Sequence, residues 1–594
     1  MTRSIRSLVL LMASLSMAPA LSACASTGDA NPLDEFSEET GVPDAFGQIG
    51  GDDGKEDVVG RTPVNMPGAS TEVWAVRNQW SDTNTTAARA AGLAWGAESG
   101  LDWEAKFERW VSSLKRIPSE NGYSDTIEIS TPYGGRSFPA PALECAEFGM
   151  FLRVTFASWY HLPFFLRGSD GRTTIFAGHF GFVDSAGNRY ANFPRFKTQY
   201  SDYESSWHAG QPWKTDDRLR ARNIGANDEV PFLPDVNGQT ARAGAYFDEL
   251  FLNKRVGYFM RLVLVYFGSI NLADGANMFH IKPEATRPGD ILLERWQRVG
   301  IGHTIPVMRV GHPDATHIAP EIATGSMPRR QPHWDDTASA SHYFTSDMTG
   351  GVGESYDGDE YAKLGGGIRR WRTPVLSGNR WTNSMRAVDA SVYIADSDTA
   401  AIAARPARFD EILMVLSVEE KRDAALGLIN TARMRLREYP ASCSARTNRE
   451  DAFRTLYENA SDLGMTVAEI DAQYRTLEDY VFSELEYSQS KTCCWNSTTP
   501  AMADIILDYA QKEQSAATAQ GMCVEPTVFR ANGGNGGYEV YRLHAISMGR
   551  EADWRAWSED EPCAQRGVAA DTVLTTRAPA DWCTLPQATA EPVG

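Results

Sequence analysis

The distribution of cysteine along the chain is the strongest constraint on how the chain folds. Six of the eight cysteines lie after residue 440. Clustered cysteines in an exported chain normally form disulfides, whereas a zinc site needs matching Cys-x-x-Cys pairs, which this region lacks. We therefore expect three disulfides within a C-terminal domain, with fifteen pairings open. The six cysteines are Cys443, Cys493, Cys494, Cys523, Cys563 and Cys583.

The N-terminus supports export. Arg3 and Arg6 precede a short apolar run, and the small residues of "LSAC" lead to Cys24. This pattern resembles a bacterial lipoprotein signal, which implies that residues 1–23 are a signal peptide and that Cys24 carries the lipid that anchors the protein to the bacterial membrane. The residue that follows the lipid site is Ala25 and not an Asp, and the resemblance therefore implies sorting to the outer membrane of the cell envelope. The alternative is an ordinary secretory signal with a chance cysteine.

Residues 24–70 are predicted to form an acidic, disordered tether. Ten acidic residues and one lysine lie between residues 25 and 60, with almost no aromatic side chains, so this segment does not bury enough apolar surface to order itself. The whole chain has a formal charge of −20, which argues against a nucleic-acid partner because such proteins carry basic surfaces. We expect no cofactor and no metal, because the glycine runs lack phosphate-loop spacing and the acidic runs lack calcium-loop spacing.

Beyond residue 400 the sequence becomes helical in pattern. Ser417 with Glu420, and Thr466 with Glu469, have the spacing of capping boxes, in which each side chain bonds the backbone N–H of the other residue. We therefore predict a separate α-helical, disulfide-rich domain over residues 401–594. Its helices are expected over residues 417–437, 449–463, 466–488 and 500–513.

Residues 71–400 are predicted to form an α+β domain. The runs "DILLERW", "HTIPVMRV" and "HIAPEIATG" are short, apolar and separated by turn residues, which is typical of consecutive antiparallel strands. An apolar helix is expected to begin at Cys145 and to end near Pro163, since proline disfavours helix in the residue before it. A second apolar helix is expected over residues 244–267.

Cys145 lies about 300 residues before the cysteine cluster and has no disulfide or lipid assignment. A lone thiol in an exported protein is either a buried bystander or a reactive group. The partial positive charge of a helix N-terminus lowers the pKa of a thiol, whereas the carboxylates of Glu144 and Glu147 raise it if they face the sulfur. The direction of these two side chains is therefore a test of the site.

The residues around Cys145 and His303 resemble a known family. The blocks "ECAEFGMF", "RPGDILL" and "GIGHTIPVMRV" follow the order seen in NlpC-type cell-wall peptidases and, more broadly, in papain-like cysteine hydrolases. The resemblance implies a papain-like domain, with a buried nucleophile helix packed on an antiparallel sheet. It also implies that Cys145 attacks an amide bond, that His303 is the general base, and that the substrate is an envelope peptide such as that of peptidoglycan.

A third catalytic group is expected on the strand that follows this histidine. If Val310 pairs with His317, Thr324 lies opposite the histidine, and Ser326 or Thr324 shares its face of the sheet. Glu321 then points to the other face, although a one-residue slip reverses this arrangement. Both Ser326 and Glu321 are candidates, and Glu321 is the better group for orienting an imidazole.

Two alternatives stay open. A transglutaminase-type core would pair Cys145 with His179, with Asp184 as the further acid, although His179 also fits a packed core position between Gly178 and Phe180. The non-enzymatic alternative is an inactive envelope-binding or scaffold lipoprotein, in which the thiol is structural and the helical domain is a partner surface.

Two arginine runs lie close in sequence to the candidate site. Arg329-Arg330 and the run from Arg369 to Arg372 are able to hold an anionic or carboxylate-bearing substrate, and solvated surface is the alternative interpretation.

Overall fold

The structure is a computed structural model, and it describes most of the chain. The described residues are 61–65, 69–82, 100–119, 124–224, 242–298, 302–326, 329–355, 358–486, 498–530, 536–555 and 572–573. The predicted signal peptide, Cys24, most of the tether, and Cys493, Cys494, Cys563 and Cys583 lie outside these residues.

The α+β part is built on an antiparallel sheet with the strand order β12-β11-β10-β9-β13-β8-β16. The three strands predicted between residues 290 and 325 are present as β9, β10 and β11, and the α+β class is confirmed. The strands are β8 (Met278–Ile281), β9 (Ile291–Glu294), β10 (His303–Gly311), β11 (Ala319–Thr324), β12 (His333–Asp335), β13 (Gly367–Trp371) and β16 (Tyr393–Ile394).

Helix α3 (Cys145–Trp159) packs on one face of this sheet. It begins at the predicted residue, and every residue in it is buried. Gly149 brings the helix close to the sheet, because a Cβ there would lie 3.2 Å from Ile291 Cδ1, 3.7 Å from Pro306 Cγ and 3.8 Å from Thr304 Cγ2. Thr304 and Pro306 therefore line the face of β10 that contacts α3.

The second predicted apolar helix is divided in two. Helices α7 (Ala243–Leu250) and α8 (Lys254–Tyr266) are separated by a short turn, and Asn253 caps α8 by accepting a hydrogen bond from the N–H of Arg255 at 3.1 Å. An Asn side chain that bonds nearby backbone favours such a break. The other helices here are α2 (Trp103–Ser113), α4 (Phe196–Gln199), α5 (Glu204–His208), α6 (Asp217–Arg220) and α9 (Ser269–Leu272).

The opposite face of the sheet is covered by α10 (Thr337–Phe344) and α12 (Arg405–Ile412). Ile305 and Val307 of β10 share one hydrophobic cluster with Phe344 and Phe409 of these helices. Helix α12 therefore lies with the α+β part, and so does α11 (Thr399–Ala403), whose Ile402 clusters with Ile394 of β16, although the sequence placed residues from 401 onward in the helical domain. The 3-10 helices are η1 (Ala69–Thr71), η2 (Pro283–Ala285), η3 (Asp347–Thr349), η4 (Tyr361–Lys363), η5 (Ala387–Asp389) and η7 (Glu551–Asp553).

Three smaller antiparallel sheets complete the α+β part. Strand β1 (Arg61–Asn65) pairs with β15 (Arg380–Ser384), so the prediction that residues up to 70 are a disordered tether is wrong at this end. Val64 explains the difference, because it is fully buried in a cluster with Phe165 and Trp381. The other strands are β2 (Lys115–Pro118), β3 (Asp125–Ser130), β4 (Ser137–Pro139), β5 (Phe165–Ser169), β6 (Thr174–Gly178), β7 (Gly181–Val183) and β14 (Thr373–Ser377).

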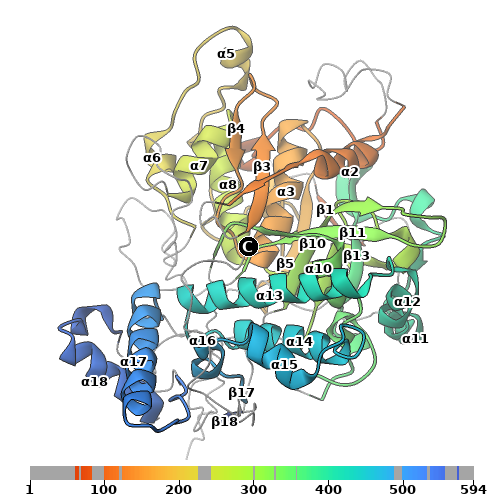
Figure 1. Cartoon of the computed structure of the whole chain (residues 1–594). Coiled ribbons are helices and arrows are strands. Elements are labelled where there is room, and N and C mark those ends of the chain that lie inside the picture. Colours follow the sequence, from red (N-terminus) through yellow and green to blue (C-terminus); the bar gives the residue numbers. More distant parts are fainter. Residues whose placement is uncertain are drawn as a thin grey trace, which may run out of the picture.

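The helical part has hydrophobic clusters of its own and lies below the sheet in Figure 1, with α3 above the sheet. Helix α13 packs against α10 and begins at the predicted capping box of Ser417 and Glu420. The elements of the helical part are α13 (Val418–Glu438), α14 (Cys443–Glu458), α15 (Val467–Tyr474), α16 (Leu477–Val481), β17 (Leu485–Glu486), α17 (Pro500–Ala519), α18 (Gly536–Ser547) and β18 (Thr572–Val573).

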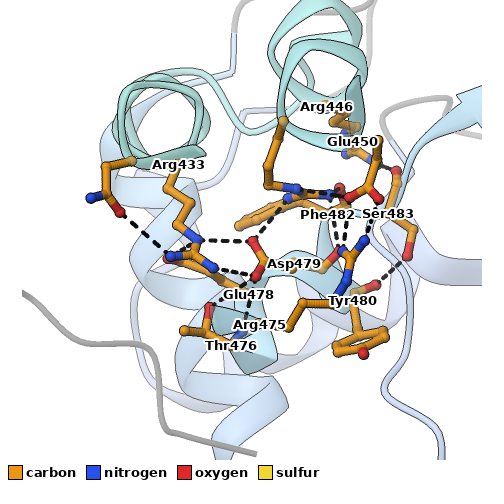
Figure 2. Close-up of polar contacts among 12 residues, drawn as sticks. Arg433, Arg446, Glu450, Arg475, Thr476, Glu478, Asp479, Tyr480, Phe482 and Ser483 are labelled. Atoms are coloured by element: carbon orange, nitrogen blue, oxygen red, sulfur yellow. Dashed lines mark hydrogen bonds and ion pairs between the residues drawn. The ribbon is translucent and has the colours of Figure 1, made fainter. Parts of the chain in front are cut away.

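A buried ionic network joins α13, α14 and α16, as Figure 2 shows. Asp479 accepts hydrogen bonds from Arg433 at 3.0 and 2.6 Å, and Arg449 lies 3.5 Å from the same carboxylate. Glu450 receives two further bonds from Arg475, at 3.0 and 2.7 Å. Because each of these charges has an opposite charge beside it, burial of the network is tolerable, and the network fixes the order of the helices.

Candidate functional site

The thiol of Cys145 lies at the first position of α3, where α3 meets the start of β10. Its Sγ is 3.7 Å from the carbonyl oxygen of Gly302, and the residue is 8% exposed. The backbone N–H groups of Thr304 and Ala146 face the sulfur and lower its pKa. Burial has the larger and opposite effect, and the pKa of Cys145 is raised to about 12.

The carboxylate of Glu147 is engaged by the protein. Its Oε2 accepts a hydrogen bond from the N–H of Glu144 at 2.8 Å, and its Oε1 lies 2.7 Å from Nη2 of Arg329. Both side chains of this ion pair are nearly fully buried. Glu147 therefore caps α3 and holds the segment before β12. The charges of Glu144 and Glu147 also raise the pKa of Cys145, in addition to burial.

The ring of His303 lies on the other face of β10. His303 is the first residue of the strand, and its ring centroid is 5.9 Å from that of Tyr343 in α10. Side chains alternate along a strand, so Thr304 faces α3 and His303 does not. Within the described part of the chain, no hydrogen bond joins Cys145 to the imidazole. Burial, together with the positive charge of Arg330, lowers the pKa of His303 to about 4.

The candidates for the third catalytic group are dispersed. The hairpin pairs Val310 with Pro320, and not with His317 as the sequence reasoning assumed, because the connection is longer. Thr324 nevertheless shares the face of His303, and its Oγ1 is 3.4 Å from the imidazole Nε2. Thr324 Oγ1 also donates to a backbone carbonyl of β10 at 2.9 Å.

Glu321 and Ser326 contact other residues. Oε2 of Glu321 accepts a hydrogen bond from Nε1 of Trp334 at 2.7 Å and lies 3.8 Å from Nη1 of Arg309. Ser326 Oγ accepts a hydrogen bond from Arg435 of α13 at 3.4 Å. The structure therefore does not place Glu321 beside the histidine, and it places Ser326 at the contact between the α+β and helical parts.

His179, the alternative base, is a packed core residue. Its Nδ1 accepts a hydrogen bond from the N–H of Phe164 at 3.1 Å, and its ring centroid lies 4.4 Å from that of Trp381. Burial lowers the pKa of His179 to about 3. Asp184 closes the turn after β7 by accepting N–H bonds from Ala186 and Asn188, both at 2.9 Å. The structure therefore does not join His179 and Asp184 to the thiol.

Two arginines lie near the thiol: Arg295, which the sequence reasoning missed, and Arg330, which it placed near the candidate site. Arg295 is fully buried and donates to Ser269 Oγ at 3.0 Å. Burial lowers the pKa of Arg295 to about 10, and an ionised Cys145 would raise it. Arg295 lies within the predicted strand "DILLERW", but nothing in that pattern indicates that it is near the thiol, so only the three-dimensional structure identifies it. Arg330 is partly buried, and its backbone pairs with that of Leu143, two residues before the thiol.

The second arginine run is neither solvated nor available to a substrate. Arg369, Arg370 and Arg372 are almost completely buried. Arg370 forms ion pairs with Asp290 at 2.8 Å and Asp389 at 2.7 Å. Buried arginines with such partners hold strands together, so both interpretations of this run are wrong.

The cysteines agree with the predicted pattern where they are described. Cys145 is a free thiol and Cys523 is disulfide-bonded. Cys443 begins α14, and its side chain lies outside the described set. The predicted pairing of the other cysteines stays a prediction.

Among the described residues, no three His, Cys, Asp or Glu side chains are arranged to hold a metal ion. None of the helices in the described ranges is long and apolar enough to cross a membrane. Comparisons with known proteins give no relative: no protein-family model matches the sequence, and no curated protein or solved structure matches the chain.

Proposed function

We propose that this protein is a cell-envelope lipoprotein whose papain-like α+β domain binds an envelope component without cleaving it. The observation that carries the proposal is the placement of Cys145 and His303 against opposite faces of β10. A cysteine hydrolase needs its base within hydrogen-bond reach of the thiol. The two side chains here are separated by the strand itself, so a one-residue change of register, not a rotamer change, would be needed to join them.

The ionisation of the thiol gives independent support. A pKa of about 12 leaves roughly one Cys145 in 10⁵ ionised at neutral pH. Since the thiolate is the nucleophile, such a group reacts slowly unless a base removes its proton. Burial of a small apolar thiol at the start of a core helix is instead a packing role.

The papain-like part of the proposal is supported by the order of elements. A buried helix that starts at a cysteine packs on an antiparallel sheet, and Gly302, just before the strand that starts with His303, lies against the helix start. The envelope part is supported by the lipoprotein-like leader and Cys24. Metabolic labelling with a radioactive fatty acid tests it, with Cys24→Ser expected to abolish the label.

Thiol labelling tests the central proposal. Native protein is treated with iodoacetamide at mildly acidic pH, and the modified fraction of the tryptic peptide that contains Cys145 is measured. We expect slow labelling that accelerates only on denaturation, with the same rate in His303→Ala and His179→Ala. Rapid native labelling that slows in His303→Ala would instead establish the thiol hydrolase, and slowing in His179→Ala alone would establish the transglutaminase-type enzyme.

A further inference from the structure

Among the described residues, the guanidinium of Arg330 has no hydrogen-bond or ion-pair partner. Its backbone is fixed, because the Leu143 N–H donates to the Arg330 carbonyl at 2.9 Å and the Arg330 N–H donates back at 3.5 Å. Its Nε is buried, and among the described residues it has no hydrogen-bond acceptor. No described carboxylate lies within ion-pair distance of it either. A buried donor without an acceptor costs about 1–3 kcal/mol, and more if it is charged.

The carboxylates around Arg330 are already engaged. Asp335 lies 2.8 Å from Nε2 of His333, and Glu438 lies 3.0 Å from Nη1 of Arg435. Arg435 is itself a neighbour of Arg330, and the repulsion between these two guanidiniums adds to the effect of burial in lowering the pKa of Arg330. Glu438 and Asp335 partly offset this repulsion, but no described carboxylate forms an ion pair with Arg330, so a further anion beside its guanidinium would be favourable.

The position of the two arginines defines where a bridging group would lie. Arg330 lies in the segment between β11 and β12, and Arg435 lies near the C-terminal end of α13. Arg435 also donates to Ser326 Oγ at 3.4 Å, which places that hydroxyl in the same cluster. The cluster therefore combines residues of the α+β part and of the helical part. It lies next to Leu143, which pairs with Arg330 two residues before the start of α3.

We propose that Arg330 and Arg435, with the Ser326 hydroxyl, form a binding site for the carboxylate group of a peptide at the junction of the α+β and helical parts. A planar carboxylate matches the fork of N–H donors on a guanidinium and accepts two bonds at once. A doubly charged phosphate is disfavoured, because Asp335 and Glu438 are close by and repel a dianion more than a monoanion.

This site deepens the proposed function, since it rests on the protein being a binding module and names the ligand class. It also gives the helical part a role. Because one arginine comes from each part, a ligand that bridges them would hold α13 against the segment before β12. The bound carboxylate would supply the acceptor that Arg330 lacks.

Calorimetric titration of the purified full-length protein tests the site. The probes are N-acetyl-alanyl-alanine with a free carboxylate, the same peptide as its C-terminal amide, and inorganic phosphate. We expect the free acid to bind wild-type protein, the amide not to bind, and Arg330→Gln to weaken binding of the acid at least roughly tenfold, as loss of a charged hydrogen bond does.

Arg330→Gln separates binding from folding. The Arg330 side chain has no bonded partner among the described residues, so the variant should unfold, without ligand, at the wild-type temperature or above it. Arg454→Gln is the matched control, since it removes the same charge from an exposed position on α14 and should bind as wild type does.

Each result decides the matter. Equal binding of acid and amide, wild-type affinity in Arg330→Gln, or no binding by the wild type overturns the site. Phosphate binding as strong as that of the acid overturns the carboxylate class. Hydrolysis of the bound peptide would overturn the non-catalytic function while leaving the site in place, so failure of the site and failure of the function are distinguishable.

Discussion

Arg329 and Glu147 form a buried ion pair next to the candidate thiol, with Nη2 2.7 Å from Oε1. The pair joins the first turn of α3 to the segment before β12, and Glu147 also accepts the N–H of Glu144. The two carboxylates beside Cys145 are therefore not arranged to assist thiol chemistry. They raise the pKa of the sulfur, and one of them is a structural anchor.

Glu147→Gln should destabilise the protein by about 3 kcal/mol, because it leaves the buried Arg329 charge uncompensated. The measurement is the free energy of unfolding by urea at neutral pH. Glu128→Gln is the control, since its partner Lys115 has a side chain that is 72% exposed, and the loss should be under about 1 kcal/mol. Equal losses in the two variants would show that the Arg329–Glu147 pair does not anchor α3.

Gly325→Ala should disturb the start of α3. A Cβ at residue 325 would lie 2.2 Å from the carbonyl oxygen of Leu143, and backbone there has no room to move. We expect a loss of about 1–3 kcal/mol in unfolding free energy and faster alkylation of Cys145. Gly311→Ala, where the nearest atom is the Ala319 Cβ at 3.4 Å, is the control and should change neither quantity. An unchanged Gly325→Ala protein would contradict this packing.

His179 should make the protein sensitive to acid. Burial lowers its pKa to about 3, whereas in the unfolded chain the value is about 6.5. The unfolded state therefore binds a proton that the folded state does not, and stability falls as the pH drops from about 6.5 toward 3. Relative to His179→Gln, the wild type should lose about 1.4 kcal/mol of unfolding free energy per pH unit in this range.

The control for that comparison is His208→Gln, because the His208 side chain is 59% exposed. Urea unfolding at several pH values between neutral and acid gives the slopes. His208→Gln should follow the wild-type slope. If His179→Gln follows it too, His179 is not the buried neutral residue described above.

The network in Figure 2 should fail at low pH. Burial alone would raise the pKa of Asp479, but the guanidiniums of Arg433 and Arg449 outweigh it and hold that pKa below its usual range. A depressed carboxyl pKa stabilises the fold above the unfolded value of about 3.9, and this stabilisation is lost as the pH falls through the folded value.

Asp479→Asn should therefore cost about 3 kcal/mol at neutral pH, and the difference from wild type should shrink in strong acid. Circular dichroism during urea unfolding reports it through the helical signal. Asp451→Asn, in an exposed pair with Arg454, should have little effect at either pH. A constant difference between Asp479→Asn and wild type at all pH values would contradict the network account.

The elements that depend on local pattern were predictable. Helix α3 begins at Cys145 because the pattern of apolar residues is helical from that point, and the capping box of Ser417 and Glu420 fixes the start of α13. Strand β1 was not predictable, since one buried residue, Val64, orders a segment whose composition is that of a tether.

The residues of the candidate site were predictable from the sequence, but their arrangement in space was not. Whether His303 faces α3 or α10 depends on a single residue of register, and side chains change face at each residue of a strand. The same limit applies to Glu321, which lies opposite Arg309 in β10 because the hairpin connection is longer than assumed. The position of Arg330 depends on its backbone pairing with Leu143, a residue that is distant in the sequence.

The ionisation of Cys145 is the most direct test of the account. The thiolate absorbs ultraviolet light, so the difference in absorbance between wild type and Cys145→Ser, followed against pH in native protein, reports the pKa of this one group. The account predicts no thiolate signal at neutral pH and a rise only toward a pKa of about 12 or on alkaline unfolding. A thiolate that forms with a midpoint near neutral pH, and that shifts in His303→Ala, would contradict it.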